Sequence, residues 1–65
     1  MDFKDYAMNY YHAGYIDSWR ATDETFCAKY KCRDASGNTQ ELVDYFKFDG
    51  HHFHYFMTQE ALYNA

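Results

Sequence analysis

The chain has 65 residues, a formal net charge of −4, an aromatic content of 23% and no proline. This length allows one domain, residues 1–65, and leaves little room for an enzyme pocket, which usually measures about 300 Å³ or more. The acidic balance argues against direct binding to nucleic acid or to a membrane surface, because both need a basic face. No apolar run approaches the roughly 18 residues of a membrane span, and residues 1–15 lack the apolar core of a signal peptide. We therefore expect a cytoplasmic protein.

Residues 2–13 are predicted to form a helix. Asp2 is a suitable N-cap, and Gly14 is a suitable residue to follow the last turn. The apolar stripe of this helix consists of Phe3, Ala7, Tyr10 and Tyr11. Residues 15–20 leave two alternatives open, an irregular segment or a short edge strand.

From residue 26 onward the apolar period becomes two, which is typical of strands. Three strands are predicted, over residues 26–33, 39–48 and 51–58. A five-residue loop at 34–38 joins the first pair, and a type I′ turn at Asp49-Gly50 joins the second pair. Residues 58–61 leave two alternatives open, the start of a short C-terminal helix or a frayed end. The predicted fold is α+β, with an N-terminal helix packed on a three-stranded antiparallel β-meander.

The two hairpins predict which strand residues share a face. The first loop pairs Phe26 with Phe46, and the Asp49-Gly50 turn pairs Phe46 with Phe53 and Asp44 with Tyr55. The face that the helix should cover collects Phe26, Ala28, Tyr30, Leu42, Phe46, Phe48, Phe53, Tyr55 and Met57. The opposite face collects Cys27, Lys29, Lys31, Glu41, Val43, Tyr45, Lys47, His52, His54 and Phe56.

Asp44 is the one carboxylate in the middle of the predicted core face. A buried carboxylate is costly unless it is hydrogen-bonded, and Tyr55, Tyr10 or Tyr11 could donate to it. Such a group can act as a general acid or base, but a structural role is the more frequent one. No motif of a nucleophile or a phosphate-binding loop accompanies it, so we do not expect an enzyme or a cofactor.

Two further patterns allow a second hypothesis, a small metal- or nucleic-acid-binding domain. His52 and His54 would point to one face of a strand and could chelate a metal, but Cys27 lies roughly 10 Å away, too far to complete the site. Lys29, Lys31 and Arg33 form a basic ladder that could follow a phosphate backbone. The simpler interpretation is a solvated histidine face without metal and a charged edge strand that discourages aggregation.

The remaining candidate is a protein-binding surface. Aromatic side chains rimmed by charge are typical of binding hot spots. The candidate partner-binding residues are Asp17, Trp19, Asp23, Glu24, Tyr45, His52, His54 and Phe56. The alternative for Trp19 is that it closes one end of the core. The carboxylates of the first 25 residues predict a partner with a basic surface, and the aromatic surplus also allows a homodimer.

In size and composition the chain resembles the small acidic proteins that phages and other mobile elements make. That resemblance implies a module that binds and inhibits or modulates one host protein, for example a defence nuclease. The leading hypothesis is therefore an acidic inhibitor of a host protein with a basic, nucleic-acid-binding site.

Overall fold

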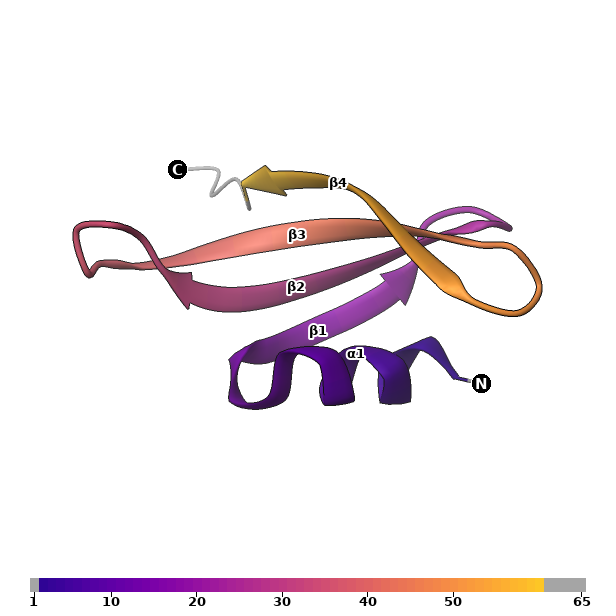
Figure 1. Cartoon of the computed structure of the whole chain (residues 1–65), viewed down its shortest axis with the longest axis horizontal. Coiled ribbons are helices and arrows are strands. Elements are labelled where there is room, and N and C mark those ends of the chain that lie inside the picture. The colour runs from indigo at the N-terminus through magenta and orange to yellow at the C-terminus, as the bar shows by residue number, and fades with distance from the viewer. Residues whose placement is uncertain (1, 61–65) are drawn as a thin grey trace.

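A computed structural model describes residues 2–60, which form one helix and one four-stranded antiparallel sheet. The elements are α1 (Phe3–Tyr11), a 3-10 turn η1 (His12–Gly14), β1 (Tyr15–Arg20), β2 (Thr25–Arg33), β3 (Thr39–Phe48) and β4 (Phe53–Glu60). Each strand pairs with the next one in sequence, so the spatial order is β1-β2-β3-β4 (Figure 1). The fold is α+β, but the predicted three-stranded meander is wrong, because residues 15–20 add a strand.

β1 is the edge strand that the sequence left as one of two alternatives. Trp19 lies opposite Cys27, and Tyr15 lies opposite Tyr30. The register shifts between Tyr15 and Asp17. This irregularity interrupts the alternation of period two by which a strand is recognised in a sequence.

α1 begins as predicted and ends two residues early. The Asp2 carboxylate accepts a hydrogen bond from the Lys4 backbone N–H at 3.4 Å, which satisfies one free donor of the first turn. His12 follows the helix with φ +53 and ψ −125, a positive φ that residues other than glycine rarely adopt. A Cβ on Gly14 would lie 2.8 Å from the Lys31 carbonyl oxygen, so only glycine allows the chain to pass β2 this closely.

The first hairpin follows the predicted register, whereas the second is shifted by two residues. β2 and β3 pair Arg33 with Thr39 and Phe26 with Phe46, and the loop spans 34–38 as predicted. In the second hairpin Phe48 pairs with Phe53 instead of His51, and Phe46 pairs with Tyr55 instead of Phe53. This shift of two residues leaves Phe53, His54 and Tyr55 on their predicted faces, because strand side chains alternate with period two.

The loop between β3 and β4 contains four residues, Asp49 to His52, so the predicted type I′ turn is wrong. That turn requires a positive φ at both central residues, and Gly50 has φ +101 while Asp49 does not have a positive φ. The Asp49 carboxylate instead accepts the backbone N–H groups of His51 and His52 at 2.8 and 2.7 Å. These hydrogen bonds stabilise the wider loop.

A second register shift lies between Tyr45 and Phe46, where β4 carries one extra residue, Phe56. Beyond this bulge Tyr45 pairs with Met57 and Asp44 pairs with Thr58. Met57 therefore lies on the face opposite to the predicted one. Thr58 to Glu60 belong to β4, so the predicted helix start at these residues is wrong, and residue 61 lies outside the described residues.

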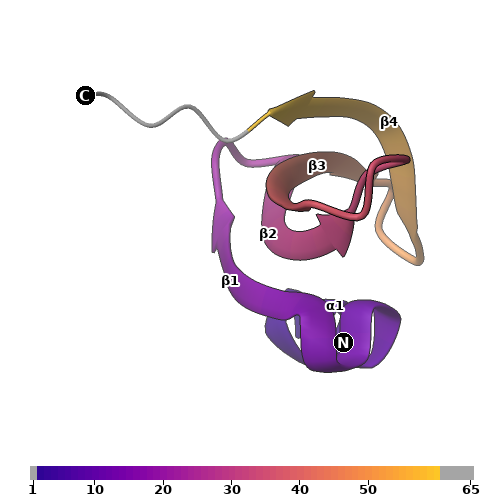
Figure 2. The ribbon, with the colours of Figure 1, turned by 90° about the vertical axis from the view of Figure 1, so that its left-hand side faces the viewer.

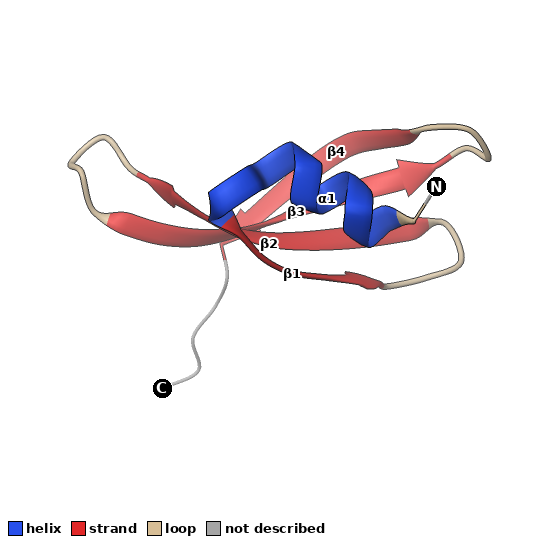
Figure 3. Cartoon of the chain, turned by 90° about the horizontal axis from the view of Figure 1, so that it is seen from below, coloured by secondary structure: helices blue, strands red, loops and turns tan. Residues whose placement is uncertain are grey.

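α1 covers one face of the sheet and packs the core there (Figures 2 and 3). The buried cluster consists of Phe3, Ala7, Ala28 and Phe46, with Tyr6, Tyr11, Tyr15, Phe26 and Phe53 packed against it. Because the sequence has few branched aliphatic residues, aromatic rings fill most of this core. The Phe3 ring centroid lies 5.1 Å from that of Phe26 and 4.9 Å from that of Phe53. Tyr10, predicted for the core stripe, touches Phe46 but is 53% exposed.

Candidate binding surface

The carboxylate of Asp44 is fully engaged by hydroxyl groups. It accepts hydrogen bonds from Tyr11 at 2.6 Å, Tyr30 at 2.9 Å and Thr58 at 2.6 Å. Burial, and then the hydrogen bond to Asp44, raise the pKa values of Tyr11 and Tyr30 well above the ordinary tyrosine value. Both hydroxyls therefore stay protonated and remain donors. This network supports the structural role of Asp44, with Tyr11 as one of the predicted donors and with Tyr55 linked only through Thr58.

The histidine cluster is organised around one carboxylate, that of Asp49. The His54 ring nitrogen Nε2 lies 2.7 Å from its Oδ2, and the backbone N–H groups of His51 and His52 donate to its Oδ1. The backbone hydrogen bond from His52, followed by that from the His54 ring and the backbone of His51, holds the pKa of Asp49 well below its usual range. Because His52 lies in the loop, it does not form the predicted strand pair with His54. Within residues 2–60, no group of three potential ligand residues could hold a metal ion.

The basic ladder was predicted to lie on an edge strand, and this prediction is wrong. β2, which carries the ladder, is an inner strand between β1 and β3. Lys31 lies opposite Glu41 as the register predicts. The ion pair, however, joins Glu41 to Lys29, with Nζ and Oε1 3.3 Å apart. Part of the ladder is thus neutralised within the sheet.

Among residues 2–60, no helix lies over the sheet face opposite α1, and we call this face the open face (Figure 2). One row across all four strands consists of Trp19, Cys27, Tyr45 and Met57 in register. Cys27 is only 1% exposed, so its neighbours on the face cover it, and this burial raises the pKa of its thiol. Trp19 and Phe56, in contrast, remain 41% and 47% exposed.

We define the open-face patch as Trp19, Tyr45, Phe56 and Met57. The Tyr45 and Phe56 ring centroids lie 6.2 Å apart, and the Lys47 ammonium lies 5.4 Å from the Phe56 centroid. The Tyr45 hydroxyl donates to Gln59 Oε1 at 3.0 Å. These contacts fix half of the patch within the molecule, whereas Trp19 has no ring or cation partner among residues 2–60.

The structure brings the predicted partner-binding residues to one face and one end of the sheet. Trp19, Tyr45 and Phe56 lie on the open face with Asp17 and His54. Asp23 and Glu24 lie in the β1–β2 turn and His52 in the β3–β4 loop, and both connections are at the same end of the sheet (Figure 1). The Phe48 backbone N–H donates to the Glu24 carbonyl oxygen at 2.9 Å and ties that turn to β3.

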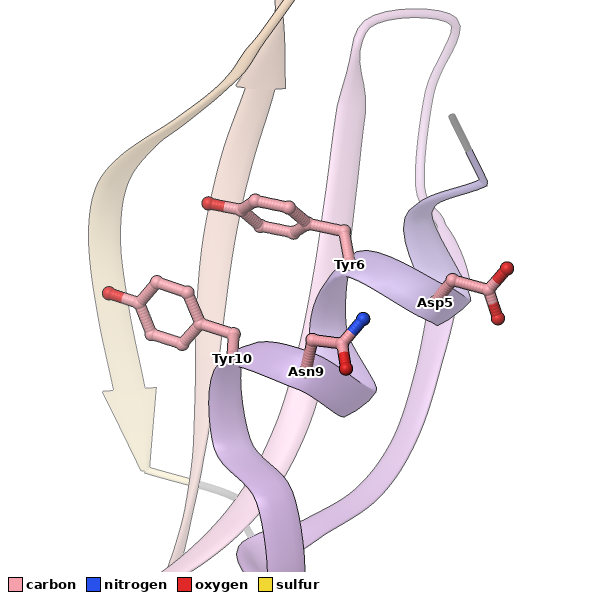
Figure 4. A pocket seen from close by; sticks show the side chains of 4 residues that line it. All are labelled: Asp5, Tyr6, Asn9 and Tyr10. Atoms are coloured by element: carbon pink, nitrogen blue, oxygen red, sulfur yellow. The ribbon is translucent and has the colours of Figure 1, made fainter.

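Sequence reasoning missed one member of this surface, Met57, and one neighbouring surface. Met57 joins the patch only because of the β4 bulge, for which the sequence carries no glycine or other marker. On the helix side, Tyr6 and Tyr10 line an open depression of 410 Å³ with Asp5 and Asn9. Figure 4 shows the two tyrosine rings extending from α1 toward β4, whereas Asp5 points away from them. The acidic and aromatic groups are thus separated there, unlike at the end of the open face.

Comparison with known proteins does not assign the chain: no family model, curated protein or solved structure matches it. Within residues 2–60, no helix is long and apolar enough to cross a membrane.

Proposed function

We propose that this protein is a small acidic protein-binding module that uses the open-face patch to bind a basic surface of a host protein. The observation that carries the proposal is the exposure of Trp19 and Phe56 on a face without a helix, beside a buried floor of Cys27 and Val43. Large aromatic rings around a well-packed floor are typical of the centre of a binding interface.

The charge at this end of the sheet indicates the character of the partner. Asp23 and Glu24 are exposed in the β1–β2 turn, and Asp17 is exposed beside Trp19 on β1. Arg20, the cation at the end of β1, is paired with Asp23 at 3.5 Å. A local negative field accelerates association with a basic surface and weakens as salt screens it.

A basic surface that accepts an acidic, aromatic-rich protein is typical of a nucleic-acid-binding groove. We therefore propose that the module inhibits or modulates a nucleic-acid-binding host protein, in the manner of the anti-defence proteins of phages and mobile elements. The inhibition would be competitive, because the protein and the nucleic acid would occupy the same basic groove.

Affinity capture with three versions of the protein tests this proposal. The wild type, a Trp19→Ala/Phe56→Ala variant and a Tyr10→Ala control serve as baits in host lysate, and mass spectrometry identifies the retained proteins. Tyr10 is the matched control because it is an exposed aromatic residue outside the open face. We expect a basic, nucleic-acid-binding protein that the wild type and the control retain and the double variant loses.

Kinetics with the captured protein complete the test. The Asp17→Asn/Asp23→Asn/Glu24→Gln variant should associate about 10-fold more slowly at low salt, with the difference disappearing at high salt. Added DNA or RNA should displace the complex. Identical retention by all three baits would contradict the proposed surface, and an unchanged association rate would contradict acidic steering.

A further inference from the structure

Trp19 is the one aromatic residue of the open-face patch on β1, and the carboxylate of Asp17 lies on the same face. Both residues pair with β2 in regular register, Asp17 with Lys29 and Trp19 with Cys27. Residues two apart on a strand are separated by about 6.6 Å and point to the same side. This separation suits a single side chain that covers the indole and reaches the carboxylate.

Among residues 2–60, no cation forms an ion pair with Asp17 or lies over the Trp19 ring. Lys29 lies opposite Asp17, but its ammonium forms the ion pair with Glu41 at 3.3 Å. Asp17 Oδ1 accepts the Ser18 backbone N–H at 2.8 Å, and no ion pair within residues 2–60 involves Asp17. The carboxylate is thus oriented by its own backbone and still exposed to an incoming cation.

Within residues 2–60, a cation lies over an aromatic ring at two other places. The Arg20 guanidinium lies 5.8 Å from the Phe26 ring centroid and donates to the carbonyl oxygens of Thr22 and Asp23 at 3.1 Å. Lys47 lies over Phe56 at 5.4 Å. Tryptophan attracts cations more strongly than phenylalanine does, yet among residues 2–60 Trp19 has no cation over its ring.

The other side of Trp19 is less selective. There Trp19 lines a recess of 160 Å³ whose charged residues are Asp2, Lys4 and Arg20. Because this recess combines one carboxylate with two cations, it does not favour a positive ligand. On the open face, in contrast, the indole lies on the same side as the Asp17 carboxylate, which forms no ion pair within residues 2–60.

We propose that Trp19 and Asp17 bind an arginine side chain of the partner, which stacks on the indole and pairs with the carboxylate. This inference rests on the proposed function and names the residue type that the patch recognises. Arginine fits this site better than lysine does, because its planar guanidinium can stack on the indole. The N–H donors at the edge of the guanidinium then remain available to the carboxylate. The ammonium group of lysine is a compact, strongly hydrated charge that does not stack on a ring.

The sole tryptophan makes the test direct, because fluorescence excited at wavelengths that tyrosine does not absorb reports on Trp19 alone. The probe is a short peptide with three arginines separated by glycines, compared with lysine and citrulline analogues of the same sequence. We expect the arginine peptide to change the fluorescence and to bind about 10-fold more tightly than the citrulline peptide, a difference of about 1.4 kcal/mol. The lysine peptide should bind with intermediate affinity.

Two isosteric variants separate a local site from general charge. Asp17→Asn should weaken arginine-peptide binding about 10-fold, whereas Asp5→Asn, which removes an exposed carboxylate of α1, should leave it unchanged. Equal affinities for the arginine and lysine peptides would overturn the arginine inference and leave acidic steering intact. Equal binding by Asp17→Asn and wild type, or no fluorescence change with any peptide, would also overturn it, whereas the capture experiment tests the proposed function independently.

Discussion

The two faces of the sheet both carry aromatic side chains, but they differ in how far these side chains are buried. On the helix side, Phe46 is 1% exposed, and the polar atoms of Asp44 all have hydroxyl partners. On the open face, Trp19 and Phe56 are nearly half exposed around a small buried floor. A chain of this size can complete one core, because a small domain buries only about 60% of the surface of its unfolded chain. Among residues 2–60, the second face therefore keeps large aromatic side chains partly exposed.

The largest expected difference between the faces is the response to ring removal. Phe46→Ala should lower the free energy of unfolding by about 3–5 kcal/mol, because it leaves a cavity beneath α1. Phe56→Ala removes the same ring from a 47% exposed position and should cost about 1 kcal/mol or less. Urea denaturation followed by circular dichroism measures both. Similar losses would show that the open face is a second core.

Carboxylates should show the same contrast on a smaller scale. Asp44→Asn disturbs the hydrogen bonds from Tyr11, Tyr30 and Thr58 and should cost about 1–3 kcal/mol. Asp17→Asn, on the open face, should change the free energy of unfolding by less than about 0.5 kcal/mol. Thermal melts at neutral pH provide the comparison, and a more stable Asp44→Asn variant would mean that Asp44 is retained for a purpose other than structure.

Alkaline pH should destabilise the helix-covered face specifically. Tyr11 and Tyr30 have raised pKa values in the folded chain, so the folded state keeps these protons above pH 10 while the unfolded state loses them. Their contribution to stability is therefore complete below about pH 10 and decreases as the pH rises further. Melting temperatures between pH 8 and pH 11 should fall less steeply for Tyr11→Phe than for wild type. A Tyr45→Phe control, which removes an exposed hydroxyl of the open face, should follow the wild type.

Acidification should loosen the loop at the end of the open face with little effect on the core. The pKa of Asp49 is lowered by the His52 backbone hydrogen bond and then by the His54 ring and the His51 backbone. A depressed carboxyl pKa adds stability above the ordinary value of about 3.9, and this stability is lost as the pH falls below it. The protection of the His51 and His52 amides from hydrogen exchange, measured relative to the intrinsic rate at each pH, should decrease at low pH before that of the core amides does. A simultaneous loss of protection throughout the sheet would contradict a local effect.

The smallest expected effect is that of metal. The described residues bring no group of three potential ligands together, and His54 is directed to Asp49. A chelator should therefore leave the melting temperature unchanged, and added zinc should not raise it. A drop on chelation that zinc reverses would support the alternative hypothesis of a metal-binding domain.

How far the sequence could predict the fold depended on how local the relevant interactions are. The N-cap Asp2 and the 34–38 loop were predicted correctly, because each depends on residues that are close in sequence. The hairpin at residues 49–52 was misassigned, because the Asp49 carboxylate binds two backbone N–H groups and favours a loop wider than the Asp-Gly pair indicates. The sequence predicted the candidate binding residues as two separate groups, one on a sheet face with Phe56 and one of carboxylates around Trp19. Only the register placed Trp19 and Phe56 on the same face.

The sequence by itself determined the α+β class, the acidic character and the faces of β2 and β3, since these follow from composition and from alternation along single segments. The tertiary structure decided the fourth strand and the position of Met57, because bulges at Ile16 and Phe56 are set by pairing with neighbouring strands. It also decided that α1 covers one face and leaves the other open. Amphipathic patterns show that a face can be buried, but only the packing of the whole chain determines which face receives the single helix.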